Sequence, residues 1–375
     1  MEKALFLVFH PLVEYSGITK KIRYQVKALN DCGVQTQLAC FAWDDKGNII
    51  RKIDSKTQEV FGRGVIAKIK KRISYAGLTA YILENKIDLL YIRSFLNAEP
   101  FLIHFVATLR RKGVKVVMEV PTYPYDNELK ELPLADKITA YIDRIFRVLL
   151  ASKLNYIVTF SCFERIFSCK TIRISNGVDF DSLPLKENYR QAPQTLELIS
   201  VSELHYWHGV DRVIAGLYEY NKEQREQKVH LNVVGKTDSP TAQRLLAQVA
   251  DLHLEDSVTF FGALSGNELN SVFEKSDFAI GSLARHRSGI TQIKTLKNRE
   301  YAGRGFGFVY SEEDSDFDNQ FYVLKAPADE SPIDIAQIVD FYHKTRLQPQ
   351  QIRQTICPLL SWKNQMQIVL NAFEK

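Results

Sequence analysis

The sequence predicts an α/β fold made of two domains, each with an open, mostly parallel sheet covered by helices. Short apolar runs of strand length alternate along the chain with amphipathic stretches of helical length, which is typical of parallel strands connected by helices. This alternation stops near the middle of the 375 residues and then starts again, and a chain of this length is long enough for two domains.

In the first half, strands are predicted where Val, Ile, Leu and Phe cluster in short runs, and helices where apolar residues recur three or four positions apart. The predicted strands are residues 4–10, 34–41, 87–93, 114–120, 154–160 and 171–175. The predicted helices lie near residues 18–30, 66–84, 98–112, 134–152 and 161–168.

Residues 179–194 have two prolines, mixed polar residues and no periodicity, so we predict a linker there. We expect a first domain at residues 1–180, a second at 195–360, and a C-terminal helix at 361–375 that packs back toward the first domain. The predicted strands of the second half are residues 196–202, 230–235, 257–262, 277–282 and 307–310. The predicted helices lie near residues 209–222, 239–252, 266–275, 295–303, 333–345 and 361–373.

Composition narrows the functional class. A net charge of +5 suits an anionic ligand or a membrane surface but is too small to indicate nucleic-acid binding, and we expect no nucleic-acid partner. Five cysteines without a C-x-x-C spacing favour reduced thiols over disulfides or a zinc site. The short N-terminal apolar run predicts a strand rather than a signal peptide, and no run reaches the ~18 apolar residues of a membrane span. We therefore expect a cytoplasmic protein.

The segment that says most about function is residues 281–301, GSLARHRSGITQIKTLKNREY. Five cations fall within fifteen of its residues, beside a glycine and a predicted helix start, which is a typical arrangement for binding phosphate: Arg285, Arg287, Lys294, Lys297 and Arg299. The alternative is a solvated basic loop.

Gln292 and Glu300 lie eight positions apart in this segment. On a regular helix they would be ~80° apart in projection and ~12 Å apart along the axis, too far to share one small ligand. If they do share a ligand, Gln292 lies on the loop and Glu300 in the first turn of a helix that opens around it.

Three further loops follow predicted strands. Residues 14–29 place Gly17 and two lysines at a helix start. Residues 118–128 combine aromatic side chains with carboxylates, which suits sugar binding, although a proline-stiffened loop with packed tyrosines is the alternative. Residues 200–217 form a strand, a loop with His208, and an amphipathic helix. Lys236 follows a strand, but the P-loop spacing is absent.

The order of these segments resembles the retaining glycosyltransferases of family 4, of the bacterial surface-polysaccharide type. The likeness spans nearly the whole chain and rests on the first loop at Gly17, the phrases SNGVD (175–179), WHG (207–209) and FFG (260–262), and REY (299–301). It implies the GT-B fold, with two Rossmann-like parallel-sheet domains facing across a cleft. It also implies a hexosyltransferase that moves a sugar from a nucleoside diphosphate sugar to a hydroxyl of a glycan or lipid-linked acceptor. The resemblance implies no metal and no cofactor.

The resemblance also assigns roles to residues. The implied catalytic residues are Gln292, Glu300 and Lys297. The implied donor-binding residues are Gly17, His208, Lys236, Gly262, Arg287, Ser288, Gly289, Thr291, Lys294 and Leu296. The implied acceptor-binding residues are Tyr123, Tyr125, Asp126 and Glu119.

The chain departs from the family pattern at three positions. Gln292 replaces the first Glu of the family's motif, Glu203 stands where an Arg is usual, and His208 stands where a Lys is usual. Lys294 or Lys297 would supply the lost charge. Two alternatives stay open: a non-catalytic GT-B binding or scaffold subunit, and a nucleotide-sugar epimerase of the same fold.

Residues 66–83 and 143–153 mix cations with apolar side chains. Such helices can lie on anionic lipid at the inner face of a membrane, but more often they cover a sheet with their apolar side, and we favour that interpretation.

Overall fold

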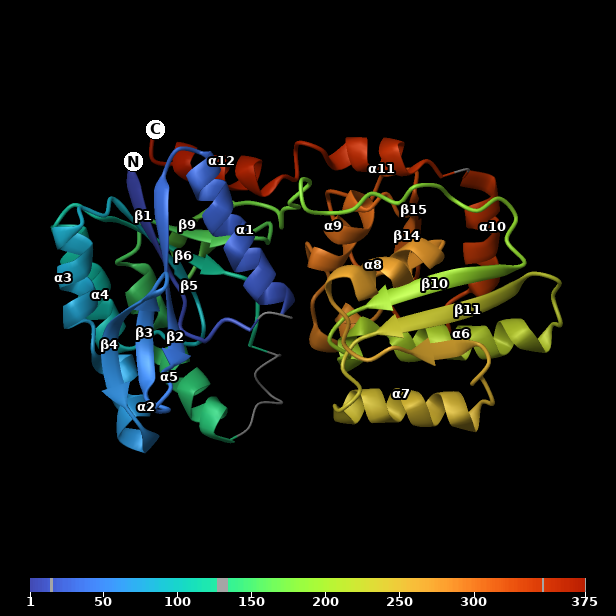
Figure 1. The fold of residues 1–375 in the computed structure, drawn as a ribbon, viewed down its shortest axis with the longest axis horizontal. Coiled ribbons are helices and arrows are strands. Elements are labelled where there is room, and N and C mark those ends of the chain that lie inside the picture. Colours follow the sequence, from blue (N-terminus) through green and yellow to red (C-terminus); the bar gives the residue numbers. More distant parts are fainter. Residues whose placement is uncertain (14–15, 127–133, 346, 375) are drawn as a thin grey trace. The chain divides into compact units, whose positions relative to one another are not determined.

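The computed structural model describes residues 1–375 except 14–15, 127–133, 346 and 375. The chain forms two compact units (Figure 1): unit 1 comprises Met1–Ser175 and Trp362–Lys375, and unit 2 comprises Asn176–Ser361. Each unit is built on a mainly parallel sheet, as the sequence predicts. Glu14 and Tyr15 of the first candidate loop, and Asn127 and Glu128 of the second, lie outside the described residues.

Unit 1 contains a nine-stranded sheet in the order β4-β3-β2-β1-β5-β6-β7-β9-β8. The six central strands of this order, β2-β1-β5-β6-β7-β9, pair in parallel. The outer strands β3, β4 and β8 pair antiparallel with their neighbours. Their bounds are β1 Lys3–Leu7, β2 Gln35–Trp43, β3 Ile49–Ile53, β4 Lys56–Gly62, β5 Leu89–Arg93, β6 Lys115–Val120, β7 Tyr156–Thr159, β8 Arg165–Ile166 and β9 Cys169–Arg173.

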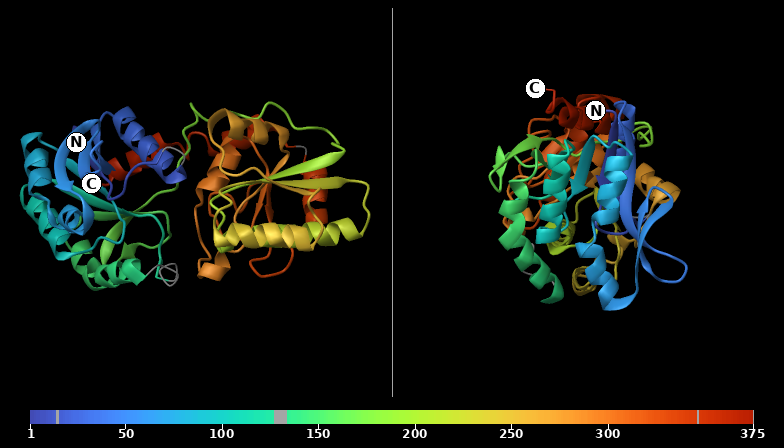
Figure 2. Two further views of the ribbon diagram at one scale, coloured as in Figure 1. Left: turned by 60° about the horizontal axis from the view of Figure 1, so that its bottom comes forward. Right: turned by 90° about the vertical axis from the view of Figure 1, so that its left-hand side faces the viewer.

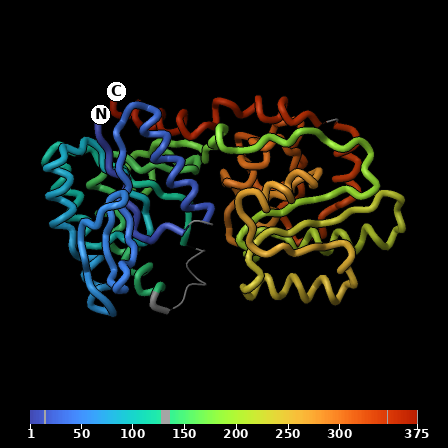
Figure 3. The backbone as a smooth tube through the Cα atoms, viewed as in Figure 1, coloured from blue at the N-terminus to red at the C-terminus, as the bar shows by residue number. Residues whose placement is uncertain are grey.

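Six helices complete the described part of unit 1: α1 Gly17–Asp31, α2 Gly64–Ile73, α3 Ala76–Glu84, α4 Pro100–Arg111, α5 Leu134–Ala151 and α12 Trp362–Asn371. The last of these comes from the C-terminal end of the chain and packs on α1, so both termini lie in the same unit (Figure 3).

Unit 2 contains a six-stranded sheet in the order β12-β11-β10-β13-β14-β15, with every pair parallel. The strands are β10 Thr195–Val201, β11 Lys228–Val234, β12 Val258–Phe260, β13 Phe278–Ile280, β14 Phe308–Tyr310 and β15 Val323–Lys325. Helices lie above and below these strands (Figure 2, left). They are α6 Val210–Lys222, α7 Pro240–Asp251, α8 Gly266–Lys275, α9 Leu296–Gly303, α10 Ile335–Thr345 and α11 Pro349–Ile356, with short 3-10 turns η2 Tyr206–His208 and η3 Arg285–Ser288.

Every predicted strand is present, but several other local predictions are wrong. Residues 161–168, expected as a helix, contain no helix: 161–164 are irregular, and Arg165–Ile166 form β8 of the β8–β9 hairpin. Its turn residues Phe167 and Ser168 have positive φ without any glycine to signal it. The single helix expected at 66–84 is split into α2 and α3. The sequence analysis also missed β3, β4, β15 and α11.

Unit 1 encloses a buried ionic cluster between α1 and the sheet. The Glu119 carboxylate on β6 is fully buried and accepts from Arg93 Nη1 at 2.6 Å, Tyr91 OH at 2.7 Å and Gln25 Nε2 at 2.6 Å. Lys21 Nζ lies 3.0 Å from it. Burial alone would raise the pKa of Glu119, but the charges of Lys21 and Arg93 and these hydrogen bonds lower it to about 2.

Replacing Glu119 with Gln should therefore lower the free energy of unfolding by about 3–5 kcal/mol, because Lys21 and Arg93 would stay buried without an anion. Urea unfolding measures the change. In the wild type this contribution is present above pH 4.5 and is lost as the pH falls toward about 2, because the folded-state pKa lies below the ordinary value.

The control is Asp126→Asn, which breaks an ion pair with Arg147 in which Asp126 is 48% exposed. It should cost less than about 1 kcal/mol. Equal losses in the two variants would contradict the special role of the buried carboxylate.

Candidate functional site

The topology of unit 2 points to one edge of its sheet. From β10 the chain adds β11 and β12 on one side, and it then crosses over to add β13, β14 and β15 on the other side. Open parallel sheets bind ligands outside the carboxyl ends of the strands at such a switch point. The candidate site is therefore the edge where β10 and β13 end.

Two short turns occupy this edge, η2 after β10 and η3 after β13. They approach closely, because the Leu283 N–H donates to the His208 carbonyl at 3.0 Å. Gly209 has a φ of 71°, and a Cβ placed on it would lie 2.8 Å from the Leu283 Cβ. The positive φ and the lack of space for a Cβ both require a glycine at this position. Gly209 of the WHG phrase therefore allows the two turns to pack against each other.

Three side chains that can carry positive charge gather at the switch point: His208 of η2, Arg285 of η3 and Lys297 of α9. Burial, and next the charge of Arg285, lower the pKa of Lys297 to about 7. Burial, followed by the charges of Lys297 and Arg285, holds the pKa of His208 well below its ordinary value, so this ring is neutral at pH 7. His208 can therefore contribute a hydrogen bond at pH 7 but not a positive charge.

A buried carboxylate, that of Glu312 after β14, faces this cluster. Its Oε1 accepts the backbone N–H of Arg285 at 3.0 Å. Burial raises its pKa, while the nearby charges of Arg285 and Lys297 act in the opposite direction. The cluster thus has more capacity for positive charge than for negative charge, as an anion site requires.

Helix α9 starts at the same place. Its N-cap Thr295 accepts from the Asn298 N–H, and the Lys297 Nζ reaches the Gly281 carbonyl at 3.5 Å. The helix extends as predicted, but it does not open around Glu300. The Thr295 cap starts it four residues earlier, so that Glu300 lies in the second turn and pairs with Arg304 at 2.9 Å.

Three of the five predicted cations are neutralised by carboxylates. Arg287, expected to bind the donor, pairs with Asp211 and Glu330. Lys294, expected to do the same, pairs with Asp316 at 2.9 Å. Arg299 is buried against Asp314 and Asp316. These ion pairs fix the loop around the site to other segments of unit 2. They also compensate part of the positive charge that the sequence places in this loop.

Gln292 lies on the loop before α9, as expected, and its amide donates to the Glu313 carboxylate at 2.7 Å. The other predicted donor residues of unit 2 lie along the same edge or on this loop. They are Lys236 after β11, Gly262 after β12, Ser288 and Gly289 at the end of η3, Thr291 on the loop, and Leu296 at the start of α9.

The predicted residues of unit 1 are Gly17, expected at a helix start, and the four residues expected to bind the acceptor. Gly17 is the first residue of α1. Glu119 is not in the loop but inside β6, in the buried cluster described above. Tyr123 packs edge-on against Phe163 and Phe167, with the first ring centroid 5.0 Å away.

The hydroxyl of Tyr125 donates to Asp143 at 3.0 Å, and Asp126 binds Arg147. Each of the four side chains that were predicted to bind the acceptor therefore has a contact partner within unit 1.

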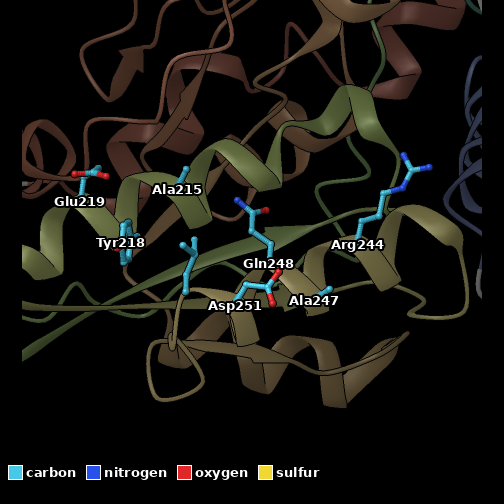
Figure 4. Close-up of a pocket in the computed structure, with 8 residues that line it drawn as sticks. Ala215, Tyr218, Glu219, Arg244, Ala247, Gln248 and Asp251 are labelled. Carbon is cyan, nitrogen blue, oxygen red and sulfur yellow. The ribbon is translucent and has the colours of Figure 1, made fainter.

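Sequence reasoning named Arg285 among the five cations but gave it no donor-binding or catalytic role, and it missed Glu312 altogether. Each directly follows a predicted strand of the second half, so the rule that carboxyl ends of parallel strands hold the ligand contained the signal. A separate cavity of about 510 Å³ lies between α6 and α7 (Figure 4). It is lined by Tyr218, Arg244 and Gln248 among others, and by none of the predicted site residues.

Residues 184–291 match the protein-family model described as glycosyl transferases group 1. The matched residues include β10 to β13 and both turns at the switch point.

A curated relative, alpha-monoglucosyldiacylglycerol synthase of Streptococcus pneumoniae, is 30% identical over 99 residues. This match spans 26% of the present chain and about a fifth (22%) of the relative's length.

Solved structures show the fold of the whole chain. Sucrose-phosphate synthase from Thermosynechococcus elongatus superposes with a TM-score of 0.70 at 12% identity, over 100% of this chain and 98% of that one. The catalytic domain of starch synthase IV from Arabidopsis thaliana, bound to ADP and acarbose, gives a TM-score of 0.64 at 12% identity, over 99% and 98%. The chain thus has the GT-B fold, as expected from the resemblance.

The perturbed lysine gives a prediction about stability. Lys297→Met should raise the free energy of unfolding at pH 7 by about 1–3 kcal/mol, because folding lowers the pKa of this lysine and so opposes its charged form. The unfolded chain binds the extra proton between pH 7 and 10.5, so the wild type gains stability as the pH rises through this range.

Urea unfolding at pH 7 and at about pH 9.5 checks this, with the gap between variant and wild type narrowing at the higher pH. A gap that does not change with pH would show that the lysine is not desolvated.

Proposed function

We propose that this protein is a retaining glycosyltransferase that binds a nucleoside diphosphate sugar at the switch point of unit 2. The observation that carries the proposal is the cluster of Arg285, Lys297 and His208 beside the start of α9. It is supported by the glycosyl transferases group 1 match, which covers the two turns of this edge. The starch synthase structure, whose description names bound ADP, agrees with a nucleotide ligand.

In this proposal the residues act by electrostatics. Arg285 and a protonated Lys297 neutralise the diphosphate, the neutral His208 ring donates a hydrogen bond, and the α9 N-terminus adds its positive dipole end. Because these groups are already desolvated, they stabilise the charge that develops on the departing diphosphate. They take the place of the Arg and Lys that the family pattern puts at positions 203 and 208. The proposal includes no metal and no cofactor besides the nucleotide sugar.

Glu300 is the proposed partner of the ribose hydroxyls, and Gln292 of the sugar or phosphate. Both would have to exchange their present partners, Arg304 and Glu313, for the donor. The acceptor is proposed to be a hydroxyl of a glycan or lipid-linked molecule in cell-surface polysaccharide synthesis. The name of the curated relative, which describes a glucosylated diacylglycerol, supports a lipid-linked acceptor.

The first test is a thermal-shift panel with UDP, GDP, ADP and dTDP and their sugars at about 1 mM, where binding to the folded state raises Tm. One base should raise Tm in the wild type, and both Lys297→Met and Glu300→Ala should greatly reduce the rise. Lys275→Met, an exposed lysine on α8, is the control. No rise with any nucleotide would favour the alternative of a non-catalytic GT-B subunit.

A second test follows the proton on Lys297. At pH 8 this lysine is mostly neutral, because its pKa is about 7, and a bound diphosphate should raise that pKa. Nucleotide binding should therefore take up close to one proton, measured by titration calorimetry in buffers of different ionisation enthalpy. Lys297→Arg should still bind but without the uptake, because arginine stays charged. Undiminished uptake in Lys297→Arg would assign the proton to another group.

A further inference from the structure

Two helices of unit 1, α2 and α5, turn their large apolar side chains toward solvent. Ten of these side chains are between 36% (Ile142) and 71% (Val65) exposed. We call them the α2–α5 face: Val65, Ile66, Ile69, Ile73, Ile138, Tyr141, Ile142, Ile145, Val148 and Leu149. The favoured sequence interpretation, that the apolar side of these helices covers the sheet, is wrong for these residues.

On α2 the exposed apolar side chains form one stripe. The buried residue of this helix is Ala67, which lies about 160° around the helix from Ile69. The helix therefore contacts the protein through a small residue and presents its isoleucines outward. An ordinary surface helix does the reverse.

The same inversion occurs on α5. Its exposed apolar residues follow one another at spacings of one or three from Ile138 to Leu149, so they lie on one side of the helix. Asp143, about 160° around the helix from Ile145, is buried, and it accepts the backbone N–H of Ala98. Asp143 shares the inward side of the helix with Ala140 and Leu150, while six large apolar side chains face outward.

The two helices form a single surface. Arg72 at the end of α2 donates to the Thr139 hydroxyl of α5 at 3.2 Å. Figure 1 and the right-hand view of Figure 2 both show α2 and α5 at the same end of unit 1. Contiguous apolar surface of this kind marks an interaction site in soluble proteins.

The charges around the face indicate the partner. Among the described side chains of the two helices, the exposed charged ones are four cations, Lys68, Lys70, Lys137 and Arg144, and one carboxylate, Asp136. On α2 the two lysines flank the apolar stripe on either side. Long cationic side chains beside inserted isoleucines are suited to lie between acyl chains and anionic headgroups. A protein partner would not require this one-sided charge.

We propose that the α2–α5 face binds the surface of a bilayer that contains anionic lipid. Among the described residues, no helix is long and apolar enough to cross a membrane, and the proposed contact lies in the plane of the interface. This inference concerns unit 1 and does not rest on the nucleotide site of unit 2. It gives the protein a surface on which a lipid-linked acceptor is concentrated.

Vesicle flotation of the full chain tests the proposal. We expect binding to phosphatidylcholine vesicles with about 30% phosphatidylglycerol, much less binding to phosphatidylcholine alone, and weakening by salt. The variants Ile66→Ser/Ile69→Ser and Ile142→Ser/Ile145→Ser should each lower the partition coefficient at least ~10-fold, because two inserted aliphatic side chains are lost. Both variants should keep the far-UV circular dichroism of the wild type, since the substituted side chains are exposed.

The matched control is Leu83→Ser/Phe321→Ser, which removes two exposed apolar side chains outside the face and should bind vesicles like the wild type. Lack of wild-type binding to anionic vesicles, or equal loss in the control, would overturn the proposal. A wild-type dimer that the serine variants convert to monomer, without vesicle binding, would assign the face to a second copy of the chain. Thermal shift with nucleotides on the same serine variants tests the donor site separately. A loss of vesicle binding with an unchanged nucleotide-induced rise in Tm concerns the α2–α5 face alone.

Discussion

Parallel strand pairing is the constraint on which the rest of this structure depends. Because every pair in the unit 2 sheet is parallel, the loops after β10, β11, β12, β13 and β14 all open at one edge. The crossover between β10 and β13 then brings η2 and η3 against each other. Residues from positions 208, 285, 297 and 312 meet there although the chain separates them widely. The proposed donor site is a direct result of this topology.

Burial of charge has opposite results in the two units. In unit 1, Lys21 and Arg93 surround Glu119, and the carboxylate receives a donor on every side, which stabilises a closed cluster. In unit 2, Arg285 and Lys297 face the carboxylate of Glu312, which also accepts a backbone N–H. The second cluster disfavours its own positive charge, and the pKa of Lys297 falls. A bound anion would relieve this cost, which links instability of the empty site to ligand binding.

Amphipathic helices raise the question of which side faces the protein. The stretches that form α2 and α5 have the periodicity of helices that cover a sheet, and amphipathic helices usually bury their apolar side. The structure places Ala67 and Asp143 inward instead, so the apolar stripe is available to a partner. Periodicity reports that a helix has two sides, but only the packing shows which of them is buried.

The sequence by itself determined the fold class, all of the parallel strands of the two sheets except β15, and the cationic segment before α9. These depend on local patterns of apolar residues, which are read directly from the chain. It did not reveal the β8–β9 hairpin, whose turn lacks glycine, or the carboxylate partners of Arg287, Lys294 and Arg299. Those carboxylates are brought to the cations by the fold, so the local sequence around each cation does not show which charges are neutralised. Tertiary structure alone therefore decided which cations of the basic loop are paired with carboxylates, and it is the basis on which Arg285 and Lys297 are proposed as the site.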